Sequence, residues 1–310
     1  MSDRPEEIAG VADIDCGGQT ALVTGSTSGI GRAAALALGR LGADVVVHGR
    51  DTAAGESVVE ELTRTGVAAT FCEADFTSVE AVRDLAATVR SETDGLDVLV
   101  NNAGGLFRDG TVTGLGVETT FHVNHLSPYL LTTELLDHLT DDARVVTTAS
   151  AAHTAATLDL ERVQGRSVNS GLGAYSHSKL ANVLFTAELA RRLDRAGSNV
   201  TANSIHPGAI PGTGFGRFLP GPLPGLLRRL EVVPGVTSVE DGAAEILFVG
   251  VSPRVDGVSG RYFTGLRPSE PSDAARSPSA ARRLWRESAR LLDIEVPLPE
   301  TDGRAMSAES

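Results

Sequence analysis

A tyrosine and a lysine four residues apart, Tyr175 and Lys179, are the pair best suited to proton transfer in this 310-residue sequence. Positions i and i+4 share one face of a helix, so the phenol and the ammonium would be neighbours. A nearby cation favours the phenolate and lowers the pKa of a tyrosine toward the range of a general acid or base. Lys179 is the only lysine beside 26 arginines, and the chain has three tyrosines. A surface pair would need these rare residues to coincide, so we interpret the pair as functional.

A serine that ends an apolar stretch, Ser150, could hold a substrate oxygen. The stretch begins at Val145 and has the pattern of a buried strand. Ligands of parallel α/β sheets bind beyond the carboxyl ends of the strands, where a hydroxyl can hydrogen-bond an oxygen that gains charge. The alternative role is a helix cap.

A glycine-rich loop, Thr24–Gly31, lies between the first apolar strand and the first expected helix. Gly25 permits a sharp turn, Gly29 lets the backbone approach a ligand, and Gly31 lets the helix pack close to the sheet. The start of the helix offers free N–H groups and a positive dipole end, which suit a pyrophosphate. The alternative is a tight turn without a ligand, but the placement after the first strand favours dinucleotide binding.

The end of the second strand bears on the choice between NADP and NAD. Enzymes that use NAD usually carry a carboxylate here for the ribose 2′-hydroxyl, whereas an arginine suits a 2′-phosphate. Gly49 occupies the acid position and Arg50 follows it, which favours NADP. A register shifted by two residues would place Asp51 there and favour NAD. The third interpretation is that these charges are solvated loop residues.

Apolar strands that alternate with amphipathic helices predict the fold class. We expect an α/β protein with a single Rossmann-type, doubly wound parallel sheet and helices on both faces. The expected strands are Thr20–Thr24, Ala43–His48, Ala68–Ala74, Leu96–Asn101, Ala143–Thr148, Val200–Ile205 and Gly260–Phe263. The expected helices are Ile30–Leu41, Ser57–Thr65, Val79–Glu92, Gly116–Leu139, Tyr175–Ala196, one after Gly242, and Ala280–Leu292.

The same pattern divides the chain into three parts. Residues 1–17 are expected to be a flexible lead-in, residues 18–264 a dinucleotide-binding catalytic domain, and residues 265–310 a C-terminal helix and tail. Within the domain, residues 209–235 are rich in Gly and Pro and carry several Phe and Leu side chains. We expect this segment to be a lid over an apolar substrate pocket.

Composition excludes several other classes of protein. The net charge of −13 argues against a general nucleic-acid binder. No apolar run reaches the roughly 18 residues of a membrane span, and the polar N-terminus is not a secretory signal. Two cysteines without a metal or disulfide pattern agree with a cytoplasmic protein.

The histidines show no metal-ligand spacing, so we expect no metal site. His153 and His177 lie near the expected site in sequence, and we interpret them as packing or solvent residues.

Taken together, these motifs resemble the short-chain dehydrogenase/reductase family. The glycine loop, the Asn101–Gly104 segment, Ser150, the Tyr175/Lys179 pair and His206–Gly208 occur in the family's order over residues 18–264. The segments Phe121–Leu126, Ala149–His153 and Ala281–Trp285 are similar to the retinol dehydrogenase-like branch.

The resemblance implies a role for each matching residue. Tyr175 would exchange the proton, Ser150 would hold the substrate oxygen, Lys179 would bind the nicotinamide ribose, and Asn124 would support a water relay to Lys179. The implied cofactor-binding residues are Gly25, Thr27, Ser28, Gly29, Ile30, Gly31, Arg50, Asp75, Phe76, Asn102, Ala103, Gly104, Tyr175, Lys179, Pro207 and Gly208. A homodimer or homotetramer is a further family expectation.

The sequence therefore predicts an NAD(P)-dependent oxidoreductase, with NADP preferred and NAD as the alternative, that interconverts an alcohol and a carbonyl on a hydrophobic small molecule. One rival is a catalytically silent nucleotide-binding regulatory protein on the same fold. Another is a reductase of C=C bonds with the same cofactor site.

Overall fold

A single twisted sheet organises the part of the chain that the computed structural model describes, residues 4–107, 110–164, 171–208 and 237–299. In these residues eight strands lie in the order β3-β2-β1-β4-β5-β6-β7-β8. All neighbours are parallel except β7 and β8, which are antiparallel. The strands are β1 Thr20–Val23, β2 Asp44–Gly49, β3 Ala69–Glu73, β4 Leu96–Asn101, β5 Leu139–Thr148, β6 Thr201–His206, β7 Tyr262–Thr264 and β8 Pro268–Ser269.

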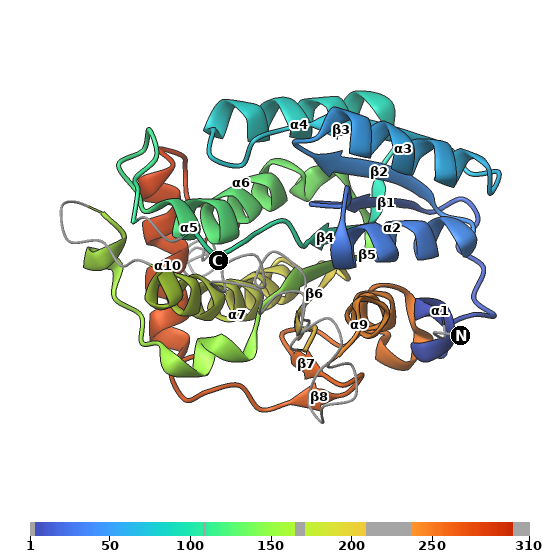
Figure 1. Cartoon of the computed structure of the whole chain (residues 1–310). Helices are drawn as coiled ribbons and strands as arrows, with labels where there is room; N and C mark the ends of the chain where they lie inside the picture. The colour runs from blue at the N-terminus through green and yellow to red at the C-terminus, as the bar shows by residue number, and fades with distance from the viewer. Residues whose placement is uncertain (1–3, 108–109, 165–170, 209–236, 300–310) are drawn as a thin grey trace, which may run out of the picture.

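Helices cover both faces of this sheet (Figure 1), which confirms the predicted doubly wound α/β fold. Alternate residues of β1 show why: Ala21 and Val23 pack into one apolar core and Leu22 into the other. The first core is covered by α1 Pro5–Ile8, α2 Gly29–Arg40, α3 Thr52–Thr63 and α9 Val239–Val251. The second is covered by α4 Val79–Glu92, α6 Ser127–Glu134, α7 Gly171–Arg195 and α10 Pro278–Leu291.

The N-terminal segment differs from the expected flexible lead-in. From Arg4 onward it is packed against the domain, with α1 beside α9 (Figure 1). Ala9 and Val11 are buried, and the Glu6 carboxylate accepts two hydrogen bonds from Arg40 at 2.6 and 2.7 Å. The reason is tertiary: a four-residue helix is marginal alone, and the core and this ion pair stabilise it.

The helix expected at Gly116–Leu139 is shorter in the structure and contains a π-helical turn. The structure has α5 Thr119–Phe121, a π-helical turn η1 His122–Leu126, α6, and a 3₁₀ turn η2 Leu136–His138. Single π-helical turns are rare and often occur at functional sites. Asn124 lies in this turn, and all five of its residues are buried.

The C-terminal part also adds more than the expected helix and tail. β8 extends the sheet, and α10 packs against α7 (Figure 1). Trp285 of α10 is fully buried, with its ring stacked on Phe185 at 5.8 Å and edge-on to Tyr129 at 5.0 Å. The predicted lid, residues 209–235, falls outside the described residues.

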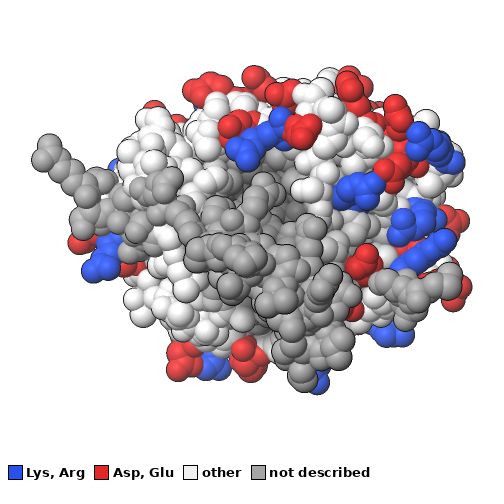
Figure 2. Space-filling model, in the orientation of Figure 1, with Lys and Arg blue, Asp and Glu red and all other residues white. Residues whose placement is uncertain are grey.

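Acidic and basic side chains are interspersed on the face of the molecule shown in Figure 2. Within the described residues, none of the helices has the length and apolar character needed to cross a bilayer.

Candidate active site

The predicted site residues gather at one edge of the sheet because parallel strands end on the same side. The glycine loop follows β1, Arg50 follows β2, Asn102 follows β4, Ser150 follows β5 and Pro207 follows β6. The carboxyl edge of a doubly wound sheet is where this fold class binds ligands.

The glycine loop forms a surface of bare backbone that fits a dinucleotide. Gly25 has a φ of +68°, and a β-carbon there would lie 2.9 Å from Ala103 Cα. A β-carbon on Gly31 would lie 2.4 Å from the Gly25 carbonyl oxygen. Ser28, the N-cap of α2, makes no side-chain hydrogen bond to the helix, and it is exposed together with Gly29. The first turn of α2 can therefore present its N–H groups to a phosphate.

Thr24 joins this loop to the strand beside it. Its hydroxyl donates to the Val100 carbonyl and accepts the N–H groups of Asn102 and Ala103 at 2.9 and 3.0 Å. The Asn102 side-chain amide donates back to the Thr24 carbonyl at 2.9 Å. Because each of these donors and acceptors has a hydrogen-bond partner and most of them are buried, the ends of β1 and β4 are held rigidly together.

The end of β2 offers a positive charge to a ligand. Arg50 is exposed, and its guanidinium lies 3.9 Å from the Asp75 carboxylate. Asp51 is occupied otherwise, because its carboxylate caps α3 by accepting the Ala54 N–H at 3.0 Å. Gly49 packs on Thr27, so a side chain at residue 49 would meet Thr27 atoms.

Sequence reasoning missed His48, which connects the glycine loop to the loop after β3. The Gly25 N–H donates to His48 Nδ1 at 3.1 Å, and His48 Nε2 donates to the Ala74 carbonyl at 3.2 Å. The ring also stacks on Phe76, with 4.5 Å between centroids. Burial lowers the pKa of His48 to about 4, so the ring is neutral at pH 7, as both bonds require. The feature of the sequence that could have identified His48 is a polar residue at the end of an apolar strand.

Ser150, Tyr175 and Lys179 come together at the ends of β5 and α7. Tyr175 and Ser150 are joined by a side-chain hydrogen bond. The Lys179 ammonium lies 5.6 Å from the centre of the Tyr175 ring and donates to the Thr148 carbonyl at 2.8 Å. Lys179 is only 4% exposed. The arrangement places the Tyr175 ring, which is bonded to Ser150, beside a buried cation.

Burial dominates the electrostatics of this cluster. It raises the pKa of Tyr175, and the hydrogen bond with Ser150 acts in the opposite direction. It also lowers the pKa of Lys179 to about 8. The expected lowering of the Tyr175 pKa by Lys179 is therefore wrong in direction: the pKa is raised, and the loss of solvent around the phenol is the largest cause.

Asn124 holds a backbone loop rather than contacting Lys179 with its side chain. Its Oδ1 accepts the Gly105 N–H at 2.8 Å, and its Nδ2 donates to the Gly105 carbonyl and to Ser178 Oγ, each at 2.9 Å. Ser178 in turn donates to the Tyr175 carbonyl at 2.8 Å. A β-carbon on Gly104 would lie 2.7 Å from Asn124 Oδ1. Asn124 thus couples the loop after β4 to the helix that carries Tyr175, and the relay to Lys179 stays a prediction.

The remaining predicted residues lie at the same edge. Phe76 is buried beneath His48, and Pro207 follows β6 with its carbonyl bonded by Thr237 Oγ1 at 3.2 Å. Gly208 has a φ of +85°, which a glycine adopts without strain.

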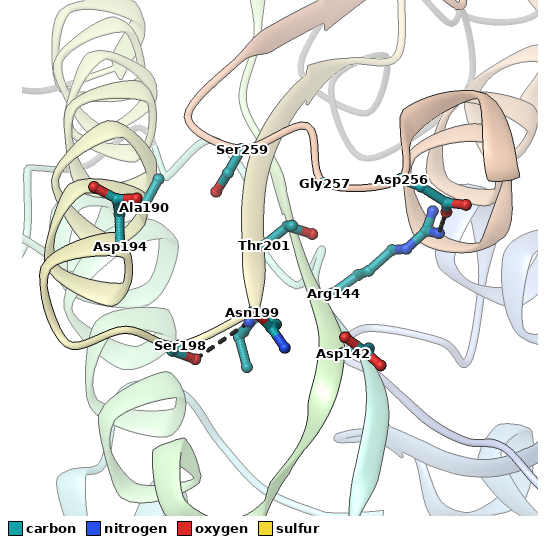
Figure 3. A pocket seen from close by; sticks show the side chains of 11 residues that line it. Asp142, Arg144, Ala190, Asp194, Ser198, Asn199, Thr201, Asp256, Gly257 and Ser259 are labelled. Atoms are coloured by element: carbon teal, nitrogen blue, oxygen red, sulfur yellow. Dashed lines mark hydrogen bonds and ion pairs between the residues drawn. The ribbon is translucent and has the colours of Figure 1, made fainter.

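A hollow of about 690 Å³ lies at the opposite edge of the sheet (Figure 3) and is not part of this site. Thr201, which begins β6, and Arg144 of β5 line it. Thr201 is five residues, or roughly 17 Å of extended strand, from the other end of β6. The Arg144 guanidinium is bonded to the Ser252 carbonyl at 2.8 Å and paired with Asp256, so its charge is compensated.

Comparisons with known proteins agree with this geometry. The family model for short chain dehydrogenases matches residues 19–219. Human retinol dehydrogenase 13 is 38% identical over 298 residues, which cover 90% of this chain and 86% of that protein. A crystal structure of a Mycobacterium paratuberculosis protein superposes with a TM-score of 0.71 at 32% identity, covering 92% of this chain and 97% of that one.

A short chain dehydrogenase from Burkholderia cenocepacia, solved in complex with NADP, superposes with a TM-score of 0.64 at 29% identity. The match covers 80% of this chain and 96% of that chain. This chain therefore belongs to the short-chain dehydrogenase family, is an oxidoreductase of alcohols and carbonyls that uses a nicotinamide dinucleotide, and is similar to the retinol dehydrogenases within that family.

Proposed function

We propose that this enzyme is NADP-dependent and interconverts an alcohol and a carbonyl on a hydrophobic small molecule through Ser150, Tyr175 and Lys179. The observation that carries the proposal is the hydrogen-bonded pair of Tyr175 and Ser150 beside the buried Lys179 ammonium. Two hydroxyls that converge on one point can hold a carbonyl oxygen, and one of them can deliver the proton.

Each residue has a distinct task during carbonyl reduction. Ser150 donates a hydrogen bond to the substrate oxygen, and Tyr175 transfers its phenolic proton to that oxygen as it gains charge. The Lys179 ammonium has three donors, of which the Thr148 carbonyl takes one at 2.8 Å. The other two are available for ribose hydroxyls, and the charge stabilises the phenolate left on Tyr175. When bound, the nicotinamide ring supplies or accepts the hydride.

The preference for NADP is supported by the charges at the end of β2. Arg50 is exposed, and its guanidinium can donate two hydrogen bonds to a 2′-phosphate. Of the two residues that flank Arg50 in sequence, residue 49 is a glycine and the Asp51 carboxylate caps α3, while the Asp75 carboxylate lies 3.9 Å from the Arg50 guanidinium. The Burkholderia relative bound to NADP is consistent with this preference.

An apolar substrate is supported by the start of α7. Leu172 lies three residues before Tyr175 and is 59% exposed, an unusual exposure for a large apolar side chain in this chain. Residues three apart share a helix face, so Leu172 lies on the same side as the phenol. The name of retinol dehydrogenase 13 points to a hydrophobic alcohol in that relative.

The proposal is tested with Tyr175→Phe and the matched control Tyr129→Phe. Tyr129 is also buried, but its hydroxyl donates to the Trp285 carbonyl at 3.1 Å, away from the site. With NADPH and a panel of apolar aldehydes and ketones, Tyr175→Phe should lose turnover by at least about a hundredfold. It should keep the NADPH dissociation constant, and Tyr129→Phe should keep its turnover.

Equal turnover in Tyr175→Phe and wild type would overturn the assignment of the proton donor. Binding of NADPH with no turnover of any carbonyl or alcohol by the wild type would favour the silent regulatory protein. Reduction of an enone at its C=C bond instead of its carbonyl would favour the third alternative.

A further inference from the structure

We propose that His153 is a positioning residue that fixes Ser150 and connects it to the segment between β8 and α10. This inference rests on the proposed role of Ser150 as the group that holds the substrate oxygen. His153 was expected to be a packing or solvent residue, but both of its ring nitrogens make hydrogen bonds.

The ring bridges two segments that are far apart in sequence. His153 Nδ1 lies 2.7 Å from the Ser150 carbonyl oxygen, three residues earlier. The Ser272 N–H lies 3.1 Å from His153 Nε2, a separation of 119 residues along the chain. The ring is 1% exposed and packs edge-on to Tyr262 of β7, with 5.0 Å between centroids.

These partners define a single protonation state. A carbonyl oxygen only accepts, so Nδ1 must carry the proton that it donates to Ser150. A backbone N–H only donates, so Nε2 must accept from Ser272. The neutral Nδ1–H ring satisfies both, whereas an apolar side chain would leave a carbonyl and an N–H without these bonds.

The bond to Ser150 matters because that residue starts a turn whose own hydrogen bonds are short-range. Ser150 caps the 3₁₀ turn η3 Ala151–Ala155, with its Oγ accepting the Ala152 N–H at 3.2 Å. Its carbonyl accepts the His153 N–H at 3.1 Å as well as the ring N–H. The ring therefore ties this turn to the segment between β8 and α10, while the turn also packs against α7. It limits the freedom of the residue whose hydroxyl pairs with Tyr175.

The variants His153→Asn and His153→Leu separate hydrogen bonding from packing. An asparagine side-chain amide can replace Nδ1–H as a donor to the Ser150 carbonyl, whereas leucine fills space without a donor. The control is His138→Leu, because His138 Nε2 bonds Thr93 Oγ1 at 2.8 Å at the opposite edge of the sheet. Folding of each variant is checked by its melting temperature.

Three measurements are made on the full-length protein. Amide hydrogen exchange reports the rigidity of residues 150–155 and needs no activity. Steady-state kinetics with NADPH and an apolar carbonyl reports kcat, and fluorescence titration reports the NADPH dissociation constant.

We expect His153→Leu to speed exchange at residues 150–155 and to lower kcat by about ten- to a hundredfold, because a small misplacement of a catalytic group has this effect. The NADPH dissociation constant should stay within about twofold, because the cofactor contacts lie elsewhere. His153→Asn should restore most of kcat and of the protection from exchange. His138→Leu should leave both unchanged.

Unchanged exchange at residues 150–155 in His153→Leu would overturn the inference. So would an unchanged kcat in a variant whose exchange is faster, or equal losses in the Asn and Leu variants. If the wild type turns over no carbonyl, the proposed function fails, while the exchange data still decide whether His153 positions Ser150.

Discussion

Gly49 packs so closely against Thr27 that a β-carbon on residue 49 would lie 2.4 Å from Thr27 Cγ2. The acid position at the end of β2 is therefore filled by a side chain of the glycine loop. An aspartate or glutamate there would have to displace Thr27, which lies in the loop that is expected to meet the pyrophosphate. The exposed positive charge at this end of the site is that of Arg50, which lies 3.9 Å from the Asp75 carboxylate.

Replacing Arg50 should change the choice of cofactor. Arg50→Ala should weaken NADPH binding by about tenfold or more and leave NADH binding almost unchanged, because a charge-assisted bond to a 2′-phosphate contributes roughly 1.5–3 kcal/mol. The matched control is Arg64→Ala, an exposed residue that directly follows α3 and pairs with Glu60. Fluorescence titration measures the dissociation constants of NADPH and NADH. Equal weakening of the binding of both cofactors would contradict the NADP assignment.

The contact with Thr27 predicts how an NAD-preferring variant can be made. Gly49→Asp alone should weaken both cofactors, because the new β-carbon meets Thr27. Gly49→Asp combined with Thr27→Gly removes the clash and should bind NADH better than the single variant does. If Gly49→Asp alone already prefers NADH, the glycine loop must shift at Thr27 to make room for the new side chain.

We expect the buried charge of Lys179 to lower the free energy of unfolding at neutral pH. Its pKa is lowered by burial from 10.5 to about 8, so the folded state is penalised for the charge below pH 8. Lys179→Met should therefore raise the free energy of unfolding at pH 7 by roughly 1–3 kcal/mol, since each pKa unit corresponds to about 1.4 kcal/mol. The same variant should lose turnover.

The difference in stability between the wild type and Lys179→Met should depend on pH in a defined direction. Between pH 8 and 10.5 the unfolded chain holds the Lys179 proton that the folded chain has released, so wild-type stability rises relative to Lys179→Met. Above this window the difference due to charge should vanish. Denaturant unfolding of both proteins from pH 7 to 11 measures the difference in their free energies of unfolding. A difference that stays constant over this range would show that burial does not penalise the charge on Lys179.

The sequence could predict the sheet because its strands are buried on both faces and form continuous apolar runs. Leu96–Asn101 was predicted with the bounds that the structure has. The π-helical turn could not be predicted, since apolar spacing does not distinguish i+4 from i+5 hydrogen bonding. Nor could α1, whose four residues depend on the bond between Glu6 and Arg40.

For the site, motif order located the residues that follow the strand ends, because topology fixes where those ends meet. It did not locate residues whose roles depend on distant partners. His48 contacts Gly25 and Ala74 across 23 and 26 residues, and Ser178 contacts Asn124 across 54. Such partners depend on tertiary packing, which no local pattern in one sequence reveals.

His48 should support dinucleotide binding by orienting the Gly25 N–H. His48→Phe keeps a ring that can stack on Phe76 but removes both hydrogen bonds. The NADPH dissociation constant should rise by about five- to tenfold, because one hydrogen bond contributes roughly 1 kcal/mol. His138→Phe is the control, and an unchanged constant in His48→Phe would show that the glycine loop keeps its shape without this bond.

The same variant predicts a pH effect on stability. The pKa of His48 is lowered from 6.5 to about 4, so the unfolded chain takes up this proton first as the pH falls. The stabilisation that neutral His48 provides is therefore lost between pH 6.5 and 4. The wild type should be more stable than His48→Phe at pH 7, and the difference should shrink over this window. A difference that grows toward pH 4 would contradict a neutral, buried ring.

Helix α10 should stabilise the whole domain through Trp285. The ring packs against both Phe185 and Tyr129, with the Arg192 guanidinium 5.0 Å from it, and its Nε1 donates to the Pro297 carbonyl at 3.0 Å. Trp285→Ala removes all of these contacts and should lower the free energy of unfolding by about 3–5 kcal/mol, as large-to-small aromatic changes in cores do. Trp285→Phe keeps the stack and loses only the Nε1 bond, so about 1 kcal/mol should be lost. Denaturant unfolding measures both, and equal losses would show that the hydrogen bond, rather than the aromatic packing, attaches α10 to α7.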